Sequence, residues 1–319
     1  MAETLQSAGK IYLAPMEGVV DYVMRDMLTS VGNYELCVTE FVRVTNQLYK
    51  PALFYKYCPE LKSGAKTPSG TPVMIQLLGQ DPDWMAENAA RAVELGSPGV
   101  DLNFGCPAKT VNKSKGGAIL LREPETLYKI ISAVRTAVPA NLPVSAKMRL
   151  GYEDKSLALD NARAIEAAGA NRLTVHARTK VEGYKPPAHW HWIAKIREEV
   201  TLPLVANGDI WTAEDAEACR RESGCQDIMI GRGAMALPNL SRVIADGAAP
   251  LSWDQVRGLL LRYAGIERSD HRGGFLPSRI KQWFTYLRLC YPAADEMFRD
   301  LKRLQALEEI SAMLSDGNQ

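Results

Sequence analysis

A cysteine in a stiff turn is the residue best placed for chemistry in this sequence. Cys106 ends the stretch Asn103-Phe104-Gly105-Cys106 and is followed at once by Pro107. Proline fixes its own φ and donates no hydrogen bond, so the turn is stiff and the direction of the thiol is set. A lone cysteine is more often a buried core residue. This context reverses that expectation and makes Cys106 a candidate reactive residue.

Other polar residues follow short apolar runs in the same way. Lys147 lies inside such a run, where an unpaired cation is costly. His176 taken alone would be interpreted as a core histidine with satisfied hydrogen bonds. So many polar residues at the ends of successive runs indicate one shared site. The set comprises Met16, Glu17, Gln76, Asn103, Cys106, Lys147, Arg149, His176, Arg178, Asn207, Gly208, Asp209, Gly231, Arg232 and Gly233.

The elements that would position these residues are eight short apolar runs, mostly alternating with segments of helical spacing. Strand–helix alternation predicts a parallel sheet, and eight units predict a (β/α)8 TIM barrel, whose strand carboxyl ends meet at one mouth. An open doubly wound sheet is the alternative, but no Gly-x-Gly-x-x-Gly follows any strand. The predicted strands are residues 11–14, 36–39, 73–77, 100–103, 144–148, 172–176, 204–208 and 227–232.

Helix signals occupy the segments between the strands and the end of the chain. Asp21 and Asp81-Pro82 are predicted to begin helices. Further helices are predicted at residues 124–138, before Gly169, and at 190–200 and 213–221. Beyond about residue 250 the strands stop, and helical spacing is found at 253–266, around 280–289 and at 295–314. We therefore expect a barrel domain at 1–248 and an all-helical domain at 249–319.

The helical domain contains a basic and aromatic stretch. Residues 271–294 include no Asp or Glu. A solvated amphipathic helix would explain this, and so would a nucleic-acid surface, in which cations meet phosphates and aromatic rings meet unpaired bases. The cations and rings in the stretch are Arg272, Phe275, Arg279, Lys281, Trp283, Phe284, Tyr286, Arg288 and Tyr291.

Composition excludes several classes of protein. The chain has 319 residues with 46% hydrophobic and 24% charged residues and a formal net charge of +1, as in an ordinary globular protein. No apolar run approaches the roughly 20 residues of a membrane span, and the N-terminus lacks the regions of a signal peptide. The six cysteines form no C-x-x-C pair, which argues against a metal site or disulfides and predicts a reducing, cytoplasmic location. No membrane or protein partner is implied.

The last two strand ends are typical of a phosphate site. Barrels often bind phosphate after strands seven and eight, through glycine N–H groups, and Arg232 could add a bidentate contact. Together with Lys147 on the fifth strand and Gln76 on the third, this would suit FMN. The lysine would lie near the pyrimidine edge, where reduced flavin carries negative charge. Cys106 would then stand across the substrate as a proton donor.

These motifs resemble those of the tRNA-dihydrouridine synthase family over nearly the full length. The Asn-x-Gly-Cys-Pro turn, with the other motifs in this order, is highly specific. The resemblance implies an FMN-binding barrel followed by a helical tRNA-binding domain. It further implies reduction of the C5–C6 double bond of a D-loop uridine to 5,6-dihydrouridine, with NADPH as the hydride source. The motifs are residues 14–18, 76–79, 101–107, 147–149, 176–179, 207–209 and 231–233.

The same resemblance assigns roles to individual residues. Cys106 would protonate C5 of the uracil while hydride reaches C6, and Asn103 would help to hold the uridine. FMN would be bound by Ala14, Pro15, Met16, Gln76, Lys147, His176, Asn207, Gly208, Asp209, Gly231 and Arg232. Other tRNA contacts are expected from Arg43, Tyr184, Arg279, Lys281, Trp283, Arg288 and Arg303. The stretches 39–44 and 279–283 are most similar to those of bacterial members that act on position 16.

Two other functions stay open at this point. An FMN barrel could act on a small pyrimidine or related molecule, but it would not need the basic, aromatic helical domain. A non-catalytic RNA-binding flavoprotein is the second alternative, and the presence of both Cys106 and Lys147 argues against it.

Overall fold

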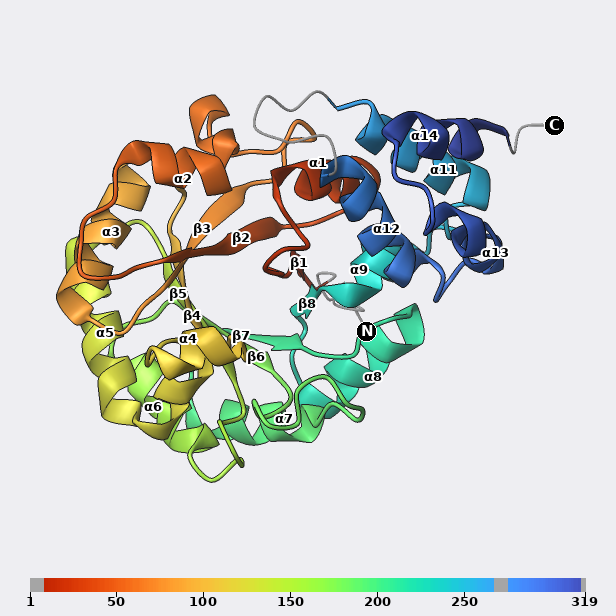
Figure 1. Ribbon diagram of the computed structural model, residues 1–319. Helices are drawn as coiled ribbons and strands as arrows, with labels where there is room; N and C mark the ends of the chain where they lie inside the picture. Colours follow the sequence, from red (N-terminus) through yellow and green to blue (C-terminus); the bar gives the residue numbers. More distant parts are fainter. Residues whose placement is uncertain (1–8, 267–274, 317–319) are drawn as a thin grey trace, which may run out of the picture.

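The computed structural model describes residues 9–266 and 275–316 (Figure 1). Eight parallel strands close into a barrel in sequence order, with β1 paired to β8. The predicted TIM-barrel class is therefore confirmed. The strands are β1 (Ile11–Leu13), β2 (Leu36–Arg43), β3 (Val73–Leu78), β4 (Val100–Phe104), β5 (Val144–Arg149), β6 (Arg172–His176), β7 (Leu204–Asn207) and β8 (Ile228–Ile230).

The strands were recognisable because both of their faces are buried. Alternate side chains point to opposite faces of a strand. In β1, Tyr12 belongs to a cluster separate from that of its neighbours Ile11 and Leu13, which pack in the main core. Both faces are apolar, so the strands read as continuous hydrophobic runs. The second cluster comprises Tyr12, Ala14, Leu36, Val38, Met74, Val205 and Met229.

Six helices of the barrel begin or end near the predicted positions. Asp21 caps α1 by accepting a hydrogen bond from the N–H of Met24 at 3.0 Å. Asp81 caps α3, which has Pro82 at its first position. These caps are local signals, so the sequence is sufficient to place them. The helices are α1 (Tyr22–Val31), α3 (Pro82–Glu94), α5 (Pro124–Ala137), α6 (Ala158–Ala167), α7 (Trp190–Glu199) and α8 (Ala213–Ser223).

Several short helices near the strand ends were not predicted. Each has too few residues for a periodic apolar pattern to be visible. These short helices lie in the segments that follow β2, β4 and β8. These elements are α2 (Pro51–Tyr57), the 3-10 helix η1 (Pro59–Ser63), α4 (Lys109–Lys113), the 3-10 helix η2 (Gly117–Arg122), α9 (Arg232–Ala236) and α10 (Leu240–Asp246).

The C-terminal region is helical, as expected, but the prediction of one helix over 295–314 is wrong. The segment forms α13 (Pro292–Leu301) and α14 (Leu307–Ser315). Leu301, Leu304, Leu307 and Ile310 keep a three-residue spacing across the break, so the apolar period could not reveal it. The other helices of this region are α11 (Trp253–Ala264) and α12 (Phe275–Leu287).

The helical region packs directly on the barrel. Trp283 of α12 donates a hydrogen bond from its indole to the carbonyl of Met235 in α9, at 3.1 Å. Buried side chains of the barrel and of α11–α14 form one continuous apolar cluster. The boundary between domains 1–248 and 249–319 stays a prediction. Within the described ranges, no helix combines the length and apolarity needed to cross a membrane.

Candidate active site

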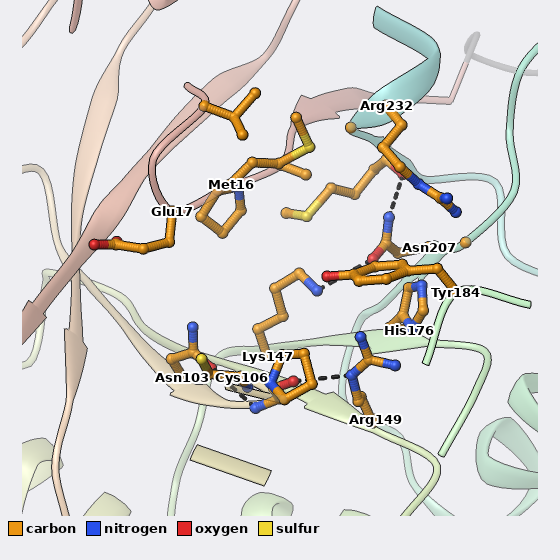
Figure 2. A pocket seen from close by; sticks show the side chains of 18 of the residues that line it. Met16, Glu17, Asn103, Cys106, Lys147, Arg149, His176, Tyr184, Asn207 and Arg232 are labelled. Atoms are coloured by element: carbon orange, nitrogen blue, oxygen red, sulfur yellow. Dashed lines mark hydrogen bonds between the residues drawn. The ribbon is translucent and has the colours of Figure 1, made fainter. Parts of the chain in front are cut away.

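A cavity of about 730 Å³ opens at the carboxyl ends of the strands (Figure 2). The cavity gathers Cys106 and every residue expected to bind the flavin. Figure 2 shows Met16 and Cys106 on opposite sides of it, with Lys147 extending toward Asn207. The predicted residues lining it are Ala14, Pro15, Met16, Glu17, Arg43, Gln76, Asn103, Cys106, Lys147, Arg149, His176, Tyr184, Asn207, Gly208, Asp209, Gly231, Arg232 and Gly233.

The turn that carries Cys106 is held from both sides. Asn103 accepts hydrogen bonds from the N–H groups of Gly105 and Cys106, each at 2.9 Å. The carbonyl of Cys106 accepts from the Asn112 amide at 2.8 Å and from the N–H of Ala118 at 3.1 Å. The position of the thiol is therefore fixed by the backbone as well as by Pro107.

The environment keeps the Cys106 thiol protonated. Burial raises its pKa, and the negative charge of Glu17 acts in the same direction. Burial and nearby Glu40 also raise the pKa of the Glu17 carboxyl to about 7. At neutral pH the thiol is thus an acid that can give up a proton rather than a thiolate nucleophile.

A buried network connects this turn to the barrel interior. Asp101 accepts hydrogen bonds from the Gln76 amide at 2.7 Å and from the Ser145 hydroxyl at 2.6 Å. The side-chain Oε1 of Gln76 accepts in turn from the side-chain amide of Asn103 at 2.8 Å. These bonds set the orientation of both amides. Each amide nitrogen carries two hydrogens, so Gln76 and Asn103 each retain one for a ligand.

Lys147 places a cation in the cavity. Its ammonium donates to the side-chain Oδ1 of Asn207 at 3.1 Å, and the side-chain amide nitrogen of Asn207 donates to the Met229 backbone carbonyl at 2.8 Å. Burial, with a contribution from the positive charge of Arg149, lowers the pKa of Lys147 to about 8. The group is largely charged at pH 7, and an anionic partner would stabilise that charge.

His176 is neutral and has hydrogen-bonding capacity left. Burial and the positive charges of Arg149 and Lys147 hold its pKa well below the usual range. Its Nδ1 has no hydrogen-bond partner within the described part of the chain. The ring of Tyr184 lies edge-on to the imidazole, with 6.0 Å between centroids. A neutral imidazole with a free ring nitrogen suits a polar ligand.

Arg232 lies at the predicted phosphate site after β8. Its guanidinium donates to one carboxylate oxygen of Asp209 at 3.0 Å, while Arg178 pairs with the other. It also lies over the rings of Tyr184 and Trp211, at 4.7 and 5.0 Å from their centroids. The Asp209 carboxylate therefore orients two arginines, and its expected part in a phosphate site stays a prediction. Only its N–H could serve an anion directly.

The close approach of β1 and β8 explains why residue 231, in the Gly-Arg-Gly motif after β8, is a glycine. A Cβ on Gly231 would lie 3.1 Å from the Met16 sulfur and 3.3 Å from Cβ of Ala14. A larger residue would therefore require Met16 or Ala14, which both line the cavity, to shift. Gly208 has φ of +123°, a conformation that side chains disfavour.

Arg149 has a bracing role that the sequence did not reveal. Its guanidinium donates to the carbonyl of Gly105 at 2.9 Å and to that of Gly183 at 2.9 Å. It also lies 5.1 Å from the ring centroid of Tyr184. Arg149 thus links the Cys106 turn to the loop after β6. Its place at a strand end was visible in the sequence, but its carbonyl partners are distant in the chain.

Two of the expected tRNA contacts need correction. Trp283 is only 1% exposed and its indole N–H is bonded to the Met235 carbonyl, so it cannot stack on a base or ribose in this conformation. Arg279 is buried and bonds the backbone of the β1–α1 loop. Arg272 lies outside the described residues.

The remaining expected contacts are accessible. Arg43 and Tyr184 line the cavity. On the helical region, Lys281 is half-buried, while Arg288 and Arg303 are exposed. Arg288 pairs with Asp295 at 2.9 Å.

A family profile decides the affiliation. The profile described as "Dihydrouridine synthase (Dus)" matches residues 12–314, nearly the whole chain. This chain belongs to the dihydrouridine synthase family. The resemblance inferred from the strand-end motifs is therefore confirmed.

Curated relatives of this family match along almost their full length. A tRNA-dihydrouridine(16) synthase of Shewanella oneidensis is 56% identical over 308 residues, which cover 97% of this chain and 98% of that protein. Proteins of the same name from Vibrio cholerae and Pseudomonas syringae pv. tomato are each 53% identical. The match to the Vibrio protein covers 94% of both chains, and the match to the Pseudomonas protein covers 96% of this chain and 98% of that protein.

Solved structures support the barrel independently. The old yellow enzyme homologue NCR from Zymomonas mobilis superposes with a TM-score of 0.54 at 15% identity, covering 76% of this chain and 90% of that one. A variant of NCR gives a TM-score of 0.55 at 16% identity, with 76% and 88% coverage. Identity this low supports the fold alone.

Proposed function

We propose that this protein is an FMN-dependent enzyme that reduces the C5–C6 double bond of uridine 16 in the tRNA D-loop to 5,6-dihydrouridine, with NADPH as reductant. The observation that carries the proposal is the meeting of the Cys106 thiol and the Lys147 ammonium in one cavity at the barrel mouth. The names of the relatives, at 53–56% identity, support the choice of tRNA and of position 16.

The residues of the cavity fit a flavin mononucleotide. Lys147 offers a cation for the edge of the ring that becomes negative, and His176 offers a ring nitrogen that has no hydrogen-bond partner among the described residues. Arg232, held by Asp209, is suited to the phosphate. Bound FMN would supply the hydride that reaches C6 of the uracil.

The protein would supply the proton and the orientation of the base. Cys106, whose pKa is raised by burial, would give its proton to C5 and then regain one from solvent. The second amide hydrogen of Asn103 would bind a uracil oxygen, while its first stays on Gln76. Because Asn103 also holds the N–H of Cys106, one residue would align both base and acid.

Removing Arg232 should weaken FMN binding. A bond to a charged group contributes about 1.5–3 kcal/mol, so Arg232→Ala should raise the dissociation constant of FMN by about 10- to 100-fold. Titration of apoprotein with FMN, followed by fluorescence, measures this. Arg163→Ala is the matched control, because its exposed ion pairs lie on the outer helices. Unchanged FMN affinity in Arg232→Ala would place the phosphate elsewhere.

The helical region is proposed to anchor the tRNA. A D-loop uridine must leave its neighbours to enter the cavity, at a cost of a few kcal/mol that contacts elsewhere must offset. Lys281, Arg288 and Arg303 of the helical region are candidates for phosphate contacts. This extends the proposed division of the chain at residue 248.

Lys281→Ala and Arg288→Ala should each weaken tRNA binding in a salt-dependent way. Each lost phosphate contact should reduce the slope of log affinity against log salt by about one unit. Filter binding across a salt series measures the slope, and FMN content should match that of the wild type. If both variants bind tRNA like the wild type at every salt concentration, the helical region is not the anchor.

Nucleoside mapping of tRNA from a strain lacking the gene tests the function as a whole. Dihydrouridine should disappear at position 16 and return with the wild-type gene, but not with a Cys106→Ala gene. Loss at position 17 or 20 instead would contradict the position and leave the chemistry standing. Equal reduction of free uridine and tRNA by the purified protein would favour the small-molecule alternative.

A further inference from the structure

The loop between β1 and α1 forms one wall of the cavity, yet its backbone is held by the distant C-terminal region. Pro15, Met16 and Glu17 of this loop line the cavity. The next residues, Gly18 and Val19, turn their carbonyls toward α12. Figure 1 shows α12 lying beside α1 and α9 at this side of the barrel.

Two side chains of α12 bind these carbonyls. The Arg279 guanidinium donates through Nη1 to the Gly18 carbonyl and through Nη2 to the Val19 carbonyl, the latter at 2.6 Å. The Gln282 amide donates to the same Gly18 carbonyl at 3.0 Å. Consecutive carbonyls match the fork of a guanidinium, which a lysine cannot reproduce with a single nitrogen.

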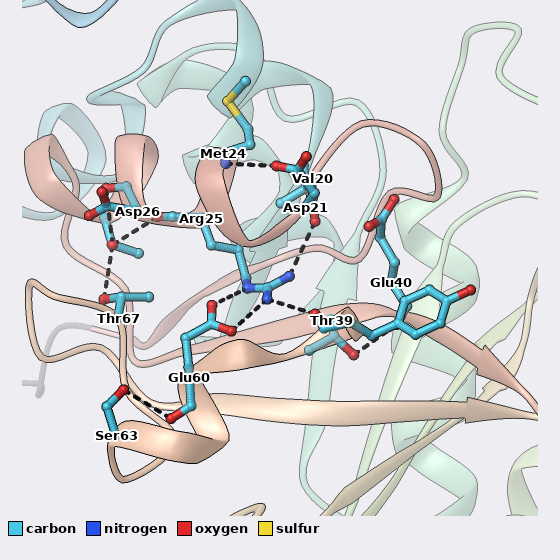
Figure 3. A network of polar contacts seen from close by, with 12 residues as sticks. Val20, Asp21, Met24, Arg25, Asp26, Thr39, Glu40, Glu60, Ser63 and Thr67 are labelled. Carbon is cyan, nitrogen blue, oxygen red and sulfur yellow. Dashed lines mark hydrogen bonds and ion pairs between the residues drawn. The ribbon is translucent and has the colours of Figure 1, made fainter. Parts of the chain in front are cut away.

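The opposite side of the loop is held by the barrel. Glu40 of β2 accepts a hydrogen bond from the N–H of Gly18. Arg25 of α1, paired with Glu60 at 2.9 Å, donates to the Val20 carbonyl at 3.4 Å. Figure 3 shows Glu40, Arg25 and Asp21 around the start of α1. The loop is therefore fixed between the barrel and α12.

Burial and charge distinguish Arg279 from a surface cation. The residue is 9% exposed, and Asp21 lies 3.6 Å from its Nη2. Hydrogen bonds from a charged donor are stronger than neutral ones, and their loss from a buried site leaves carbonyls unsatisfied. A guanidinium committed to Gly18, Val19 and Asp21 has little capacity left for a phosphate of tRNA.

We propose that Arg279 is a positioning residue, which fixes the β1–α1 loop through the Gly18 and Val19 carbonyls and thereby holds Pro15 and Met16 against the flavin. This inference rests on the proposed assignment of the cavity to FMN. It makes correct docking of α12 a condition for tight flavin binding, although Arg279 itself does not line the cavity. Gln282 supports Arg279 in two ways, by donating a neutral hydrogen bond to the Gly18 carbonyl and by accepting one from the Arg279 guanidinium.

The test separates a clamp on the loop from a contact with tRNA. In Arg279→Ala apoprotein, the dissociation constant of FMN should rise about tenfold or more, on the scale of one charged hydrogen bond. Hydrogen exchange of the peptide covering residues 14–20 should become faster in the absence of FMN. The affinity for tRNA and its salt slope, measured on FMN-saturated protein, should stay at wild-type values.

Companion variants keep the test decisive if Arg279→Ala unfolds. Arg279→Lys should recover part of the FMN affinity, because an ammonium can reach one of the two carbonyls. Gln282→Ala should change FMN affinity and exchange in the same direction by a smaller amount. Arg299→Ala is the matched control, since this arginine is exposed on α13 and, within the described part of the chain, pairs only with Asp295 at 3.7 Å.

Two results would overturn the proposal. Wild-type FMN affinity and exchange in Arg279→Lys and Gln282→Ala would show that the contacts do not hold the loop. A lower tRNA affinity and salt slope with normal FMN binding would return Arg279 to the role of a phosphate contact. Neither readout requires dihydrouridine to be formed, so failure of the proposed function would be seen separately.

Discussion

Replacing Cys106 with alanine should reduce dihydrouridine formation by about a hundredfold or more, the scale lost with a positioned acid. The thiol is the proposed proton donor and lines the cavity, and burial raises its pKa and keeps it protonated. Its backbone is held by Asn103 and Asn112, so the turn should keep its shape without the sulfur. Flavin content should therefore match that of the wild type.

Single-turnover reduction of tRNA by flavin-reduced protein measures this loss without interference from product release. Cys290→Ala is the matched control, because that cysteine is exposed on the helical region. In the wild type, the rate should fall as pH rises through the raised pKa of the Cys106 thiol. Near-normal reduction of tRNA by Cys106→Ala would remove Cys106 as the acid.

Lys147→Met should make the apoprotein more stable at pH 7 but should lower the reduction potential of the bound flavin. The pKa of Lys147 is lowered from 10.5 to about 8 by burial. Between these two values an unfolded lysine keeps its proton while the folded one has lost it. The cost of burying the charged amine is therefore present in full below about pH 8 and disappears toward pH 10.5.

Removing the amine should consequently stabilise the apoprotein at pH 7 by on the order of 2 kcal/mol. This is less than the full shift of the Lys147 pKa implies, because the side chain is only half-buried. The gain should vanish near pH 10.5. Urea unfolding of FMN-free protein at both pH values measures it, with the exposed Lys129→Met as control. A destabilised Lys147→Met apoprotein at pH 7 would show that the ammonium is stabilised by partners instead.

The same variant should lower the potential of the bound flavin. A cation near the ring stabilises the reduced flavin more than the oxidised flavin. If this extra stabilisation of about 1.5–3 kcal/mol is lost, the potential of a two-electron couple should fall by about 30–60 mV. Dye equilibration measures the potential. Arg232→Ala should instead weaken the binding of oxidised and reduced FMN by the same factor, so the potential of the bound flavin should stay unchanged. Equal effects of the two variants on affinity, with no change in potential, would contradict this division of roles.

The barrel and the turn that carries Cys106 were predictable because their signals are local. Strands buried on both faces read as continuous apolar runs, and Asp21 and Asp81 cap helices through atoms two or three residues away. The stiffness of the Cys106 turn follows from the adjacent Pro107. The gathering of strand-end residues then follows from the topology of a barrel, without any further information.

Only the tertiary structure decided which side chains form hydrogen bonds and ion pairs with residues that are distant in the sequence. Trp283 and Arg279 belong to a basic, aromatic pattern that is the same whether a helix faces solvent or the barrel. The structure turns both inward, onto Met235 and the β1–α1 loop. The Asp209 carboxylate likewise serves Arg178 and Arg232, which lie on other segments. A sequence specifies which side chains can donate or accept, but the choice of partner depends on which segments pack together.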